Sequence, residues 1–368
     1  MTALSRRFGR PAAAPAGGIA PRSAGGRRMR RFTAVSGVTL LGVMVASAFL
    51  FPLVFMTSTA FKEKAQLTTP GAPMYPAQPD KFSWQGAEYP VYDVPMPDGT
   101  IRSLALVEPH REDSLFVDPA APDQGAFTWV GRWRTLQQHW SFSLTFQNFA
   151  TAWDVIAFPR LLFNTVAIAT IGTLGAVLSS ICVAYGFSRF RFRGRNAIFL
   201  LLLSTIILPL QVTLIPTFAV FSALGWVGTW LPLIVPHFFA NAYNVFLLRQ
   251  YFRTIPRDLD EAAMIDGAGP LRVLVSVIVP QAKAAIVAVS LFHFFWAWND
   301  FFLPLIYLQG NRTLQPLSVG IAEFNALYGQ EPTLIQAGAI MAMALPVIVF
   351  FLAQRAFMRG IVFSGVEK

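Results

Sequence analysis

The chain has 368 residues, of which 54% are hydrophobic and only 13% are charged. This composition is too apolar for a water-soluble globular domain of the same length, and it predicts a membrane protein. The formal net charge of +10 would suit a nucleic-acid binder, but membrane topology explains it better, so no nucleic-acid partner is expected. The single cysteine, Cys182, excludes a disulfide framework and a cysteine metal site within one chain.

Six apolar segments are long enough to cross the hydrocarbon core of a bilayer, roughly 30 Å thick, which requires about 20 helical residues. They cover residues 33–58, 161–187, 197–221, 229–248, 283–307 and 335–354. The expected fold is therefore an all-α polytopic membrane protein with six transmembrane helices. Its expected parts are a basic, disordered tail (1–32), a first transmembrane helix (33–60), an external insertion (61–158), a transmembrane core of five helices (159–356) and a C-terminal tail (357–368).

The placement of the arginines predicts the orientation. Residues 1–31 contain eight arginines and no acidic residue, which the positive-inside rule assigns to the cytoplasm. The loops after the second and fourth spans and the C-terminal segment are also basic, so both termini are expected in the cytoplasm. Two arginine pairs near the start resemble a twin-arginine export signal, but the apolar run that follows is long and lacks a clear cleavage site, which favours an uncleaved anchor.

The segment between the first two spans has a different composition. Residues 62–158 carry seven basic and eleven acidic side chains, a net charge of −4, which suits an external location. The turn signal Pro97-Asp98-Gly99 separates two strand-like runs, at 89–94 and 100–107, and a second pair is expected at 114–117 and 126–130. We therefore expect a small, β-rich external insertion.

A charged segment between the fourth and fifth spans predicts a short helix from about Asp258 to Asp266. Pro256 precedes this helix, and Asp258 stands three residues ahead of Glu261, which is the pattern of a capping box. Gly267 follows the helix as a stop that can adopt the left-handed conformation.

The spacing of this segment resembles the EAA loop of ATP-binding-cassette (ABC) importer permeases. The matched positions are Glu261, Ala262, Ala263, Gly267, Val277, Val279 and Pro280, with Val in place of the usual Ile and Leu. The runs Leu208–Pro216 and Trp298–Phe301 are similar to the third and fifth spans of carbohydrate-uptake permeases of this class. The likeness covers the membrane-embedded part, but not the N-terminal tail or residues 66–135.

The resemblance implies a permease subunit of an ATP-driven importer, for sugars, in the inner membrane of a bacterium. It also implies the partners: a second permease subunit, ABC ATPase subunits, a periplasmic substrate-binding protein and membrane lipid. The cytoplasmic coupling loop, 254–280, is expected to dock on the ATPase through Asp258, Glu261, Ala262, Ala263, Asp266 and Gly267. Ala262 and Ala263 are expected on one face of the helix.

Polar side chains inside the apolar spans are unfavourable in lipid unless they face protein or water. Asp300 is the only acidic residue in a predicted span, and Asn299 precedes it. Gln211 lies between Pro209 and Pro216, which should kink the third span. These three polar side chains are candidates for the translocation path or for helix packing, and the sequence leaves both roles open.

The loop between the last two spans, residues 309–334, lies on the expected outer side. Its candidates for contact with the periplasmic receptor are Gly320, Phe324, Asn325 and Tyr328.

The sequence contains no motif of a catalytic site. A nucleotide-hydrolysing domain needs a glycine-rich loop ending in Gly-Lys and then Ser or Thr, and none of the five lysines stands in such a loop. The four histidines form no i, i+4 pair for a metal. We expect a transport subunit with no catalytic residue, metal or cofactor. The alternatives are a secondary transporter or channel, which would need its own ion site in the membrane, and a membrane-anchored enzyme acting through the external segment.

Overall fold

The computed structural model describes residues 24–327, 329 and 331–362, and the chain divides into two compact units, residues 1–55 and 56–368. The described part of the first unit belongs to helix α1 (Ala24–Ala60), whose stretch Val35–Ala60 is long and apolar enough to cross a membrane. The helix begins within the segment expected to be a disordered tail, because the arginines and methionine there are good helix formers. Residues 1–23 of that tail lie outside the described residues.

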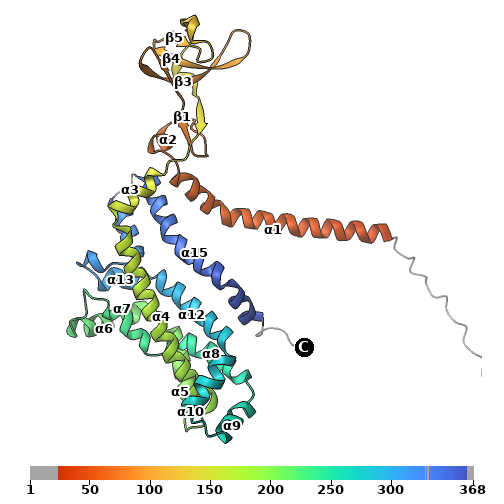
Figure 1. The fold of residues 1–368 in the computed structure, drawn as a ribbon, viewed down its shortest axis with the longest axis vertical. Coiled ribbons are helices and arrows are strands. Elements are labelled where there is room, and N and C mark those ends of the chain that lie inside the picture. Colours follow the sequence, from red (N-terminus) through yellow and green to blue (C-terminus); the bar gives the residue numbers. More distant parts are fainter. Residues whose placement is uncertain (1–23, 328, 330, 363–368) are drawn as a thin grey trace, which may run out of the picture. The chain divides into compact units, whose positions relative to one another are not determined.

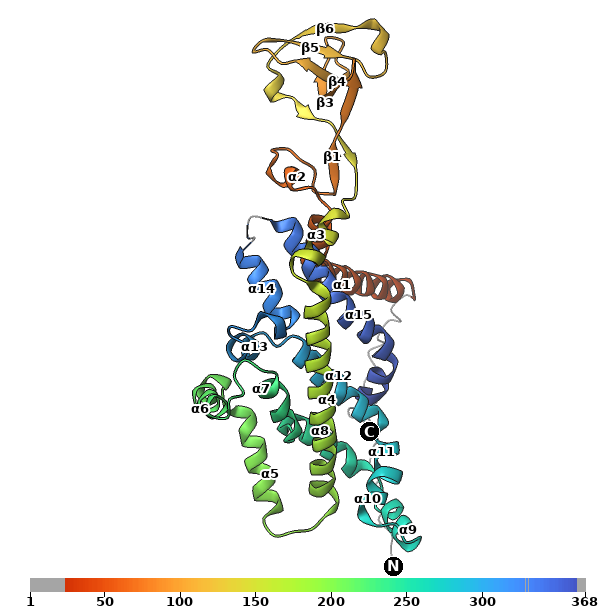
Figure 2. The same ribbon diagram turned by 60° about the vertical axis from the view of Figure 1, so that its left-hand side comes forward.

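The second unit contains a helical part and a β subdomain (Figures 1 and 2). Its helices are α2 (Lys64–Thr68), α3 (Gln147–Val155), α4 (Phe158–Arg189), α5 (Arg195–Ser204), α6 (Leu210–Ala223), α7 (Leu231–Ile234), α8 (Ala242–Thr254), α9 (Asp258–Ile265), α10 (Pro270–Val273), α11 (Val279–Gln281), α12 (Lys283–Trp298), α13 (Phe302–Tyr307), α14 (Leu317–Leu327) and α15 (Pro332–Val362). Helix α4 packs against α8 and α12, and α12 packs against α15. Leu248, Phe252 and Ile278 have no exposed surface and belong to the core cluster of this helical part.

The membrane-spanning character of the helical part is confirmed. Among the described residues, four helices are long and apolar enough to cross a membrane: Val35–Ala60, Phe158–Arg189, Leu231–Thr254 and Pro332–Gln354. Two further helix pairs are sharply bent, Arg195–Ile207 with Leu210–Ala223 at 98° and Pro270–Gln281 with Lys283–Trp298 at 83°. The number of spans is therefore four, or up to six if each bent pair counts as one span, and the expected six helices are not confirmed.

The third predicted span, 197–221, is not the single kinked helix that the sequence suggested. Leu208 is extended, with φ −67° and ψ 118°, because a proline disfavours helical backbone in the residue before it. Pro209 then precedes α6, and the chain bends by 98° at this point. Pro216, by contrast, lies inside α6 without ending it.

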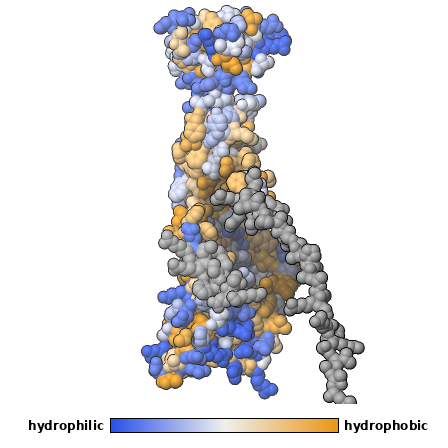
Figure 3. Space-filling model, turned by 90° about the vertical axis from the view of Figure 1, so that its right-hand side faces the viewer, coloured by the Kyte–Doolittle hydropathy of each residue, from blue (hydrophilic) through white to orange (hydrophobic). Residues whose placement is uncertain are grey.

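Apolar side chains are exposed along the helices of the second unit. In Figure 3, hydrophobic residues gather over the helical part, whereas the end that carries α9 and the β subdomain are mainly hydrophilic. Helix α6 has no buried residue, and Ile207 and Ile215 are 82% and 78% exposed. Apolar surface of this extent requires lipid or another protein chain to cover it.

The β subdomain contains two antiparallel sheets. In the smaller one, β1 (Ala77–Pro79) pairs with β8 (Trp140–Phe142). The larger one has the order β2-β3-β4-β5-β6, with β7 paired to β3. Its strands are β2 (Lys81–Trp84), β3 (Ala87–Pro95), β4 (Ile101–Glu108), β5 (Asp113–Val117), β6 (Ala126–Val130) and β7 (Gln137–Gln138). The expected β-rich insertion is therefore present.

Both predicted strand pairs are confirmed, by β3 with β4 and by β5 with β6. The first turn forms because Gly99 adopts a φ of +82° and Asp98 Oδ1 accepts a hydrogen bond from Thr100 N at 2.9 Å. Val94, Leu104 and Phe116 have no exposed surface and form the core on one side of the sheet.

Candidate functional site

Helix α9 confirms the short helix predicted in the charged loop, but its start differs in detail. The N-cap residue is Arg257, and no side chain caps the helix. Asp258 is already the first helical residue, so its carboxylate does not stand at the cap position and the predicted capping box is absent. The acids of the first turn, Asp258, Asp260 and Glu261, instead lie at the positive end of the helix dipole.

The end of α9 is as predicted. Gly267 has a φ of +81°, a conformation that only glycine adopts without strain. Its N–H donates to Met264 O at 3.0 Å, and Ala268 N donates to Ala263 O at 2.9 Å. These two bonds form a Schellman motif, which ends the helix and reverses the chain.

A buried ion pair joins α9 to the last turn of α4. Arg189 Nε lies 2.9 Å from Asp260 Oδ2, and their side chains are only 7% and 8% exposed. Arg189 Nη2 also donates to Ile255 O at 3.1 Å, just ahead of α9. Burial raises the pKa of Asp260 above its ordinary value, and the guanidinium of Arg189 opposes this rise. Sequence reasoning missed both residues, because one Asp among three and one Arg among many gave no local signal.

A second bond ties the same helix end to the segment after α9. Tyr185 Oη donates to Pro270 O at 3.0 Å. A cavity of about 250 Å³ lies between the two elements, and Tyr185, Arg189, Asp260 and Glu261 are among the residues that line it. The predicted coupling loop is thus held to α4 at two points.

The two faces of α9 differ. Ala263 is half-buried and packs against the core cluster of the helical part, and Asp260, one turn earlier, is buried. Ala262, expected on the same face as Ala263, is exposed, as are Glu261 and Asp266. Nearby apolar side chains are also exposed: Met264 at 52%, Ile265 at 87% and Leu271 at 72%.

The predicted polar residues of the spans are placed apart from one another. Gln211 is exposed in the first turn of α6. The fifth predicted span, 283–307, is interrupted, because α12 ends at Trp298 and α13 begins at Phe302. Asn299 and Asp300 lie in this break, where polar side chains that bond the backbone compete with a helix.

The contacts at this break are local. Asn299 Nδ2 donates to Phe295 O at 2.8 Å, one turn earlier. Asp300 Oδ1 accepts from Leu303 N, in the first turn of α13, at 3.3 Å, although the N-cap residue of that helix is Phe301. Asp300 O accepts from Ser318 Oγ at 2.6 Å. Within the described part of the chain, neither side chain forms a hydrogen bond with Gln211.

Inside the helical part, the polar side chains of His237, His293 and Asn244 form a connected chain that the sequence did not predict. His293 Nε2 lies 3.1 Å from His237 Nδ1, and His293 Nδ1 lies 3.2 Å from Asn244 Nδ2. Both imidazole rings also contact Trp296. His237 and Asn244 come from neighbouring segments, but His293 and Trp296 lie on α12, about fifty residues further along the chain, so no local pattern could have joined them.

The proposed receptor-contact residues lie on and after α14. A side chain at Gly320 would meet Leu161 Cδ1 at 2.2 Å, so this glycine permits close packing of α14 on α4. Phe324 is only 4% exposed and packs in a core cluster, whereas Asn325 is exposed. Tyr328 lies outside the described residues. A cavity of about 300 Å³ beside Gly320 and Phe324 is also lined by Arg312 and Glu323, which form an ion pair at 3.3 Å.

Residues 173–362 match the family described as binding-protein-dependent transport system inner membrane component. The osmoprotective compounds uptake permease protein GgtD of Synechocystis sp. is 36% identical over 209 residues, which are 56% of this chain and 69% of the relative. The sn-glycerol-3-phosphate transport system permease protein UgpE of Rhizobium meliloti is 34% identical over 209 residues, 56% of this chain and 73% of the relative. The lactose transport system permease protein LacG of Rhizobium radiobacter is 29% identical over 219 residues, 60% of this chain and 80% of the relative.

The fold has a counterpart among solved structures. A chain of a bacterial ABC transporter involved in the import of the acidic polysaccharide alginate has a TM-score of 0.63 and 20% identity, covering 92% of this chain and 99% of that chain.

The apolar helices and the loop around α9 define a multi-pass membrane protein of the ABC importer permease class. The chain belongs to the family of binding-protein-dependent transport system inner membrane components, because the match covers more than half of its length. The resemblance to carbohydrate-uptake permeases is confirmed by the family match and by these relatives. The β subdomain lies outside the matched residues.

Proposed function

We propose that this chain is one of two permease subunits of an ATP-driven, binding-protein-dependent importer for sugars, and that α9 couples it to the ATPase subunits. The observation that supports this best is the two-sided environment of α9. Asp260 and Ala263 face the helical part, whereas Glu261 and Ile265 are exposed. A helix that is held on one face and free on the other is suited to dock in the groove of a second protein.

The free face has the chemistry of a docking surface. Met264, Ile265 and Leu271 present exposed apolar side chains, which would be buried at the centre of an interface. Glu261 adds a carboxylate beside them, and charged groups of this kind belong at the polar rim of interfaces. The small side chain of Ala262 allows a partner to approach closely.

The held face supplies a route for movement. A displacement of α9 would act on Arg189 through Asp260 and on Tyr185 through Pro270. Both receiving residues lie on α4, which packs against α8 and α12. Movement of the ATPase subunits would therefore shift several membrane helices together and change the side from which the path is open.

Charge supports an orientation with α9 in the cytoplasm. The segments that carry or adjoin the ends of α4, α5, α8, α9 and α10, which lie near one another (Figures 1 and 2), contain eight arginines: Arg189, Arg191, Arg193, Arg195, Arg249, Arg253, Arg257 and Arg272. The positive-inside rule places such an end in the cytoplasm, where ATP is available. The same rule, applied to the arginine-rich residues 1–31 and to the basic C-terminal segment, favours the cytoplasm for both termini.

Two features support the proposed partners: the sequence has no phosphate-binding loop, and the helices expose apolar surface. Because the sequence lacks this loop, separate ATPase subunits must supply the energy. A second permease and lipid would cover the exposed apolar surface of α5 and α6. A periplasmic binding protein would deliver the solute, and the names of the lactose and glycerol-phosphate relatives favour a sugar or sugar-like solute.

A crosslinking experiment tests the docking surface. Cys182 is replaced by Ala, and single cysteines are then placed at the exposed Ala262 or at the inward Ala263 in the assembled importer. We expect Ala262→Cys to crosslink to the ATPase chain and the matched control, Ala263→Cys, to react far less. Equal crosslinking at the two positions, or none at Ala262→Cys in any nucleotide state, would show that the ATPase docks elsewhere.

A further inference from the structure

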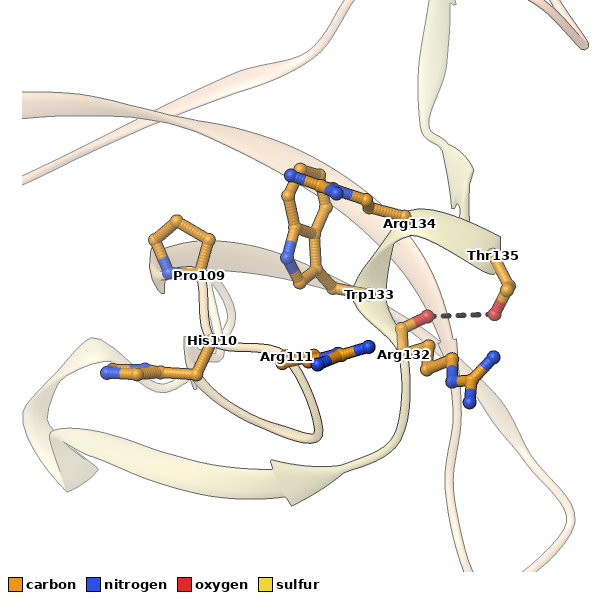
Figure 4. Close-up of a pocket in the computed structure, with 7 residues that line it drawn as sticks. All are labelled: Pro109, His110, Arg111, Arg132, Trp133, Arg134 and Thr135. Atoms are coloured by element: carbon orange, nitrogen blue, oxygen red, sulfur yellow. Dashed lines mark hydrogen bonds between the residues drawn. The ribbon is translucent and has the colours of Figure 1, made fainter.

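An open cavity of about 730 Å³ lies in the β subdomain, between the loop that joins β4 to β5 and the loop that joins β6 to β7 (Figure 4). The first loop contributes His110 and Arg111, and the second contributes Arg132, Trp133 and Arg134. The volume lies within the range of about 300–1,000 Å³ that is typical of small-molecule sites. The match to the permease family does not include this part of the chain.

The walls of the cavity are held in place by hydrogen bonds. Gly131 N donates to Glu112 O at 2.7 Å, which joins the two loops. Ser114, fully buried, accepts from His110 N at 3.0 Å and donates to His110 O at 3.1 Å. In the second loop, Thr135 Oγ1 donates to Arg132 O at 2.8 Å. The cavity is thus a built feature of the sheet edge, because both of its loops are fixed to it.

Trp133 provides an aromatic wall. Its ring packs edge-on against Tyr92, with 6.0 Å between the ring centroids, and it contacts the core of the subdomain. The guanidinium of Arg134 lies over the ring, 5.4 Å from its centroid. Figure 4 shows this stacking and shows Arg111 reaching from its loop toward the segment of Arg132 and Trp133. His110 and Arg132 point away from the indole ring.

The charge of the cavity is opposite to that of its surroundings. Three arginines line it and no acidic residue does, although the insertion as a whole has more acids than bases. Within the described residues, none of these three arginines has a carboxylate partner within 4.0 Å. By contrast, Lys81 pairs with Glu88 and Arg102 pairs with Asp98 and Asp118 elsewhere in the same subdomain. The guanidiniums of the cavity therefore remain available to an external anion.

We propose that this cavity binds an anionic saccharide, whose carboxylates are held by Arg111 and Arg134 on either side of Trp133 and whose sugar ring lies near the indole. Arginine presents a planar fork of N–H donors that matches a carboxylate, and such charge-assisted pairs are stronger than neutral hydrogen bonds. Amphipathic sugar rings commonly lie against aromatic side chains, whose flat faces are apolar. The inference deepens the proposed function, because a sugar importer gains from holding its solute outside the membrane.

The test uses the full chain in nanodiscs of phosphatidylcholine, which carries no net charge and does not compete for the site. Trigalacturonate is titrated by calorimetry, with the neutral maltotriose and inorganic phosphate as comparison ligands. We expect trigalacturonate to bind at least about tenfold more tightly than either, because it alone offers both a carboxylate and a sugar ring. Its affinity should fall as salt is raised, since ionic attraction at an open site is screened.

Variants locate the site. Arg111→Ala combined with Arg134→Ala should weaken trigalacturonate binding at least about tenfold, and Trp133→Leu should also weaken it. Arg132→Ala should have a smaller effect, because this side chain points away from the ring. Lys81→Ala is the matched control, because it removes an exposed cation that is already paired with Glu88. Circular dichroism of each variant checks that the sheet is intact.

Several results would overturn the proposal. These are equal affinity for maltotriose, unchanged trigalacturonate binding in the double arginine variant, or phosphate binding as tightly as trigalacturonate. If the cavity instead receives an acidic face of the periplasmic receptor, trigalacturonate will not bind and the double variant will weaken the receptor alone, which also overturns it. ATP-coupled uptake of a neutral sugar would survive any of these results, so failure here is distinguishable from failure of the proposed function.

Discussion

Arg189 and Asp260 form a buried ion pair, with Nε and Oδ2 2.9 Å apart, between the end of α4 and the short helix α9. Two hydrogen bonds lie beside the pair: Arg189 Nη2 donates to Ile255 O, and Tyr185 Oη donates to Pro270 O. Neither Oδ1 of Asp260 nor Nε of Arg189 has a hydrogen-bond partner among the described residues. The single charged contact therefore carries the polar connection between these two side chains.

Removing one member of the pair should both destabilise and uncouple the importer. Asp260→Ala leaves the Arg189 guanidinium buried without its carboxylate, which costs about 3–5 kcal/mol. We expect a lower midpoint of thermal unfolding and ATP hydrolysis that no longer responds to substrate. The measurements are a thermal unfolding curve of the purified chain and ATPase assays of the assembled importer.

Two variants separate charge from coupling. Asp258→Ala removes an exposed acid from the same helix and should change stability by no more than about 0.5 kcal/mol. The double variant Arg189→Met with Asp260→Leu replaces the pair by apolar groups, which should recover much of the stability. A loss of stability from Asp258→Ala as large as that from Asp260→Ala would contradict the role given to the ion pair.

Bulk on the two alanines of α9 should have different consequences. Ala263→Trp must fit into packed core, and overpacking of this kind costs about 1–3 kcal/mol, so both stability and coupling should fall. Ala262 is exposed to solvent, so Ala262→Trp should leave the midpoint of thermal unfolding unchanged while it blocks docking of the ATPase subunits. Co-purification with the ATPase chain and thermal unfolding, measured on both variants, test this. A normal ATPase complex with Ala262→Trp would count against the proposed docking face.

Gly267 should be required because its backbone adopts a left-handed conformation, and not because its surroundings leave no room for a side chain. Its φ is +81° and nothing lies within 4 Å of the position that a Cβ would take. Gly267→Val should therefore strain the turn by about 1–3 kcal/mol and misdirect α9, with loss of substrate-stimulated ATP hydrolysis. Gly269→Ala is the control, because Gly269 has a φ of −70° and equally open surroundings. Equal activity of the two variants would refute the need for the left-handed turn.

Local features of the sequence predicted α9, its glycine stop and both strand pairs, because each depends on neighbouring residues. The capping box failed because the helix begins at Asp258 itself, a shift of one position that a spacing rule does not resolve. The ion pair of Arg189 and Asp260 could not be predicted, since it depends on how α4 and α9 meet in space. Pro209 was expected to kink a helix and instead separates two, because the residue before it is extended as well.

Asp300 should act through its hydrogen bond to the first turn of α13, and not as a charged group on the translocation path. Its Oδ1 accepts from Leu303 N, and an asparagine oxygen can do the same. Asp300→Asn should therefore retain uptake, whereas Asp300→Leu should lower stability by about 1 kcal/mol through loss of this hydrogen bond. Uptake and unfolding curves of both variants provide the check. Loss of uptake in Asp300→Asn with unchanged stability would instead indicate a charge on the translocation path.

The larger sheet of the β subdomain should be dispensable for assembly. Pro79 and Trp140 are partners in the β1–β8 ladder, so residues 80–139 can be replaced by Asn-Gly to close a hairpin. This replacement retains Gln66, which is buried and bonds the segment at Pro73, Tyr75 and Ala77. We expect normal membrane insertion and subunit assembly, assayed by fractionation and co-purification. Failure to insert would show that the sheet has a structural role in the permease.

Sugar uptake by the reconstituted importer tests the central claim most directly. The chain is placed in proteoliposomes with its second permease and ATPase subunits and supplied with the receptor, and uptake is measured with ATP inside or with an imposed proton or sodium gradient. We predict uptake that requires ATP and is lost in Asp260→Ala, even though that variant still inserts. Uptake driven by the ion gradient alone, without ATP or the ATPase chain, would contradict the account.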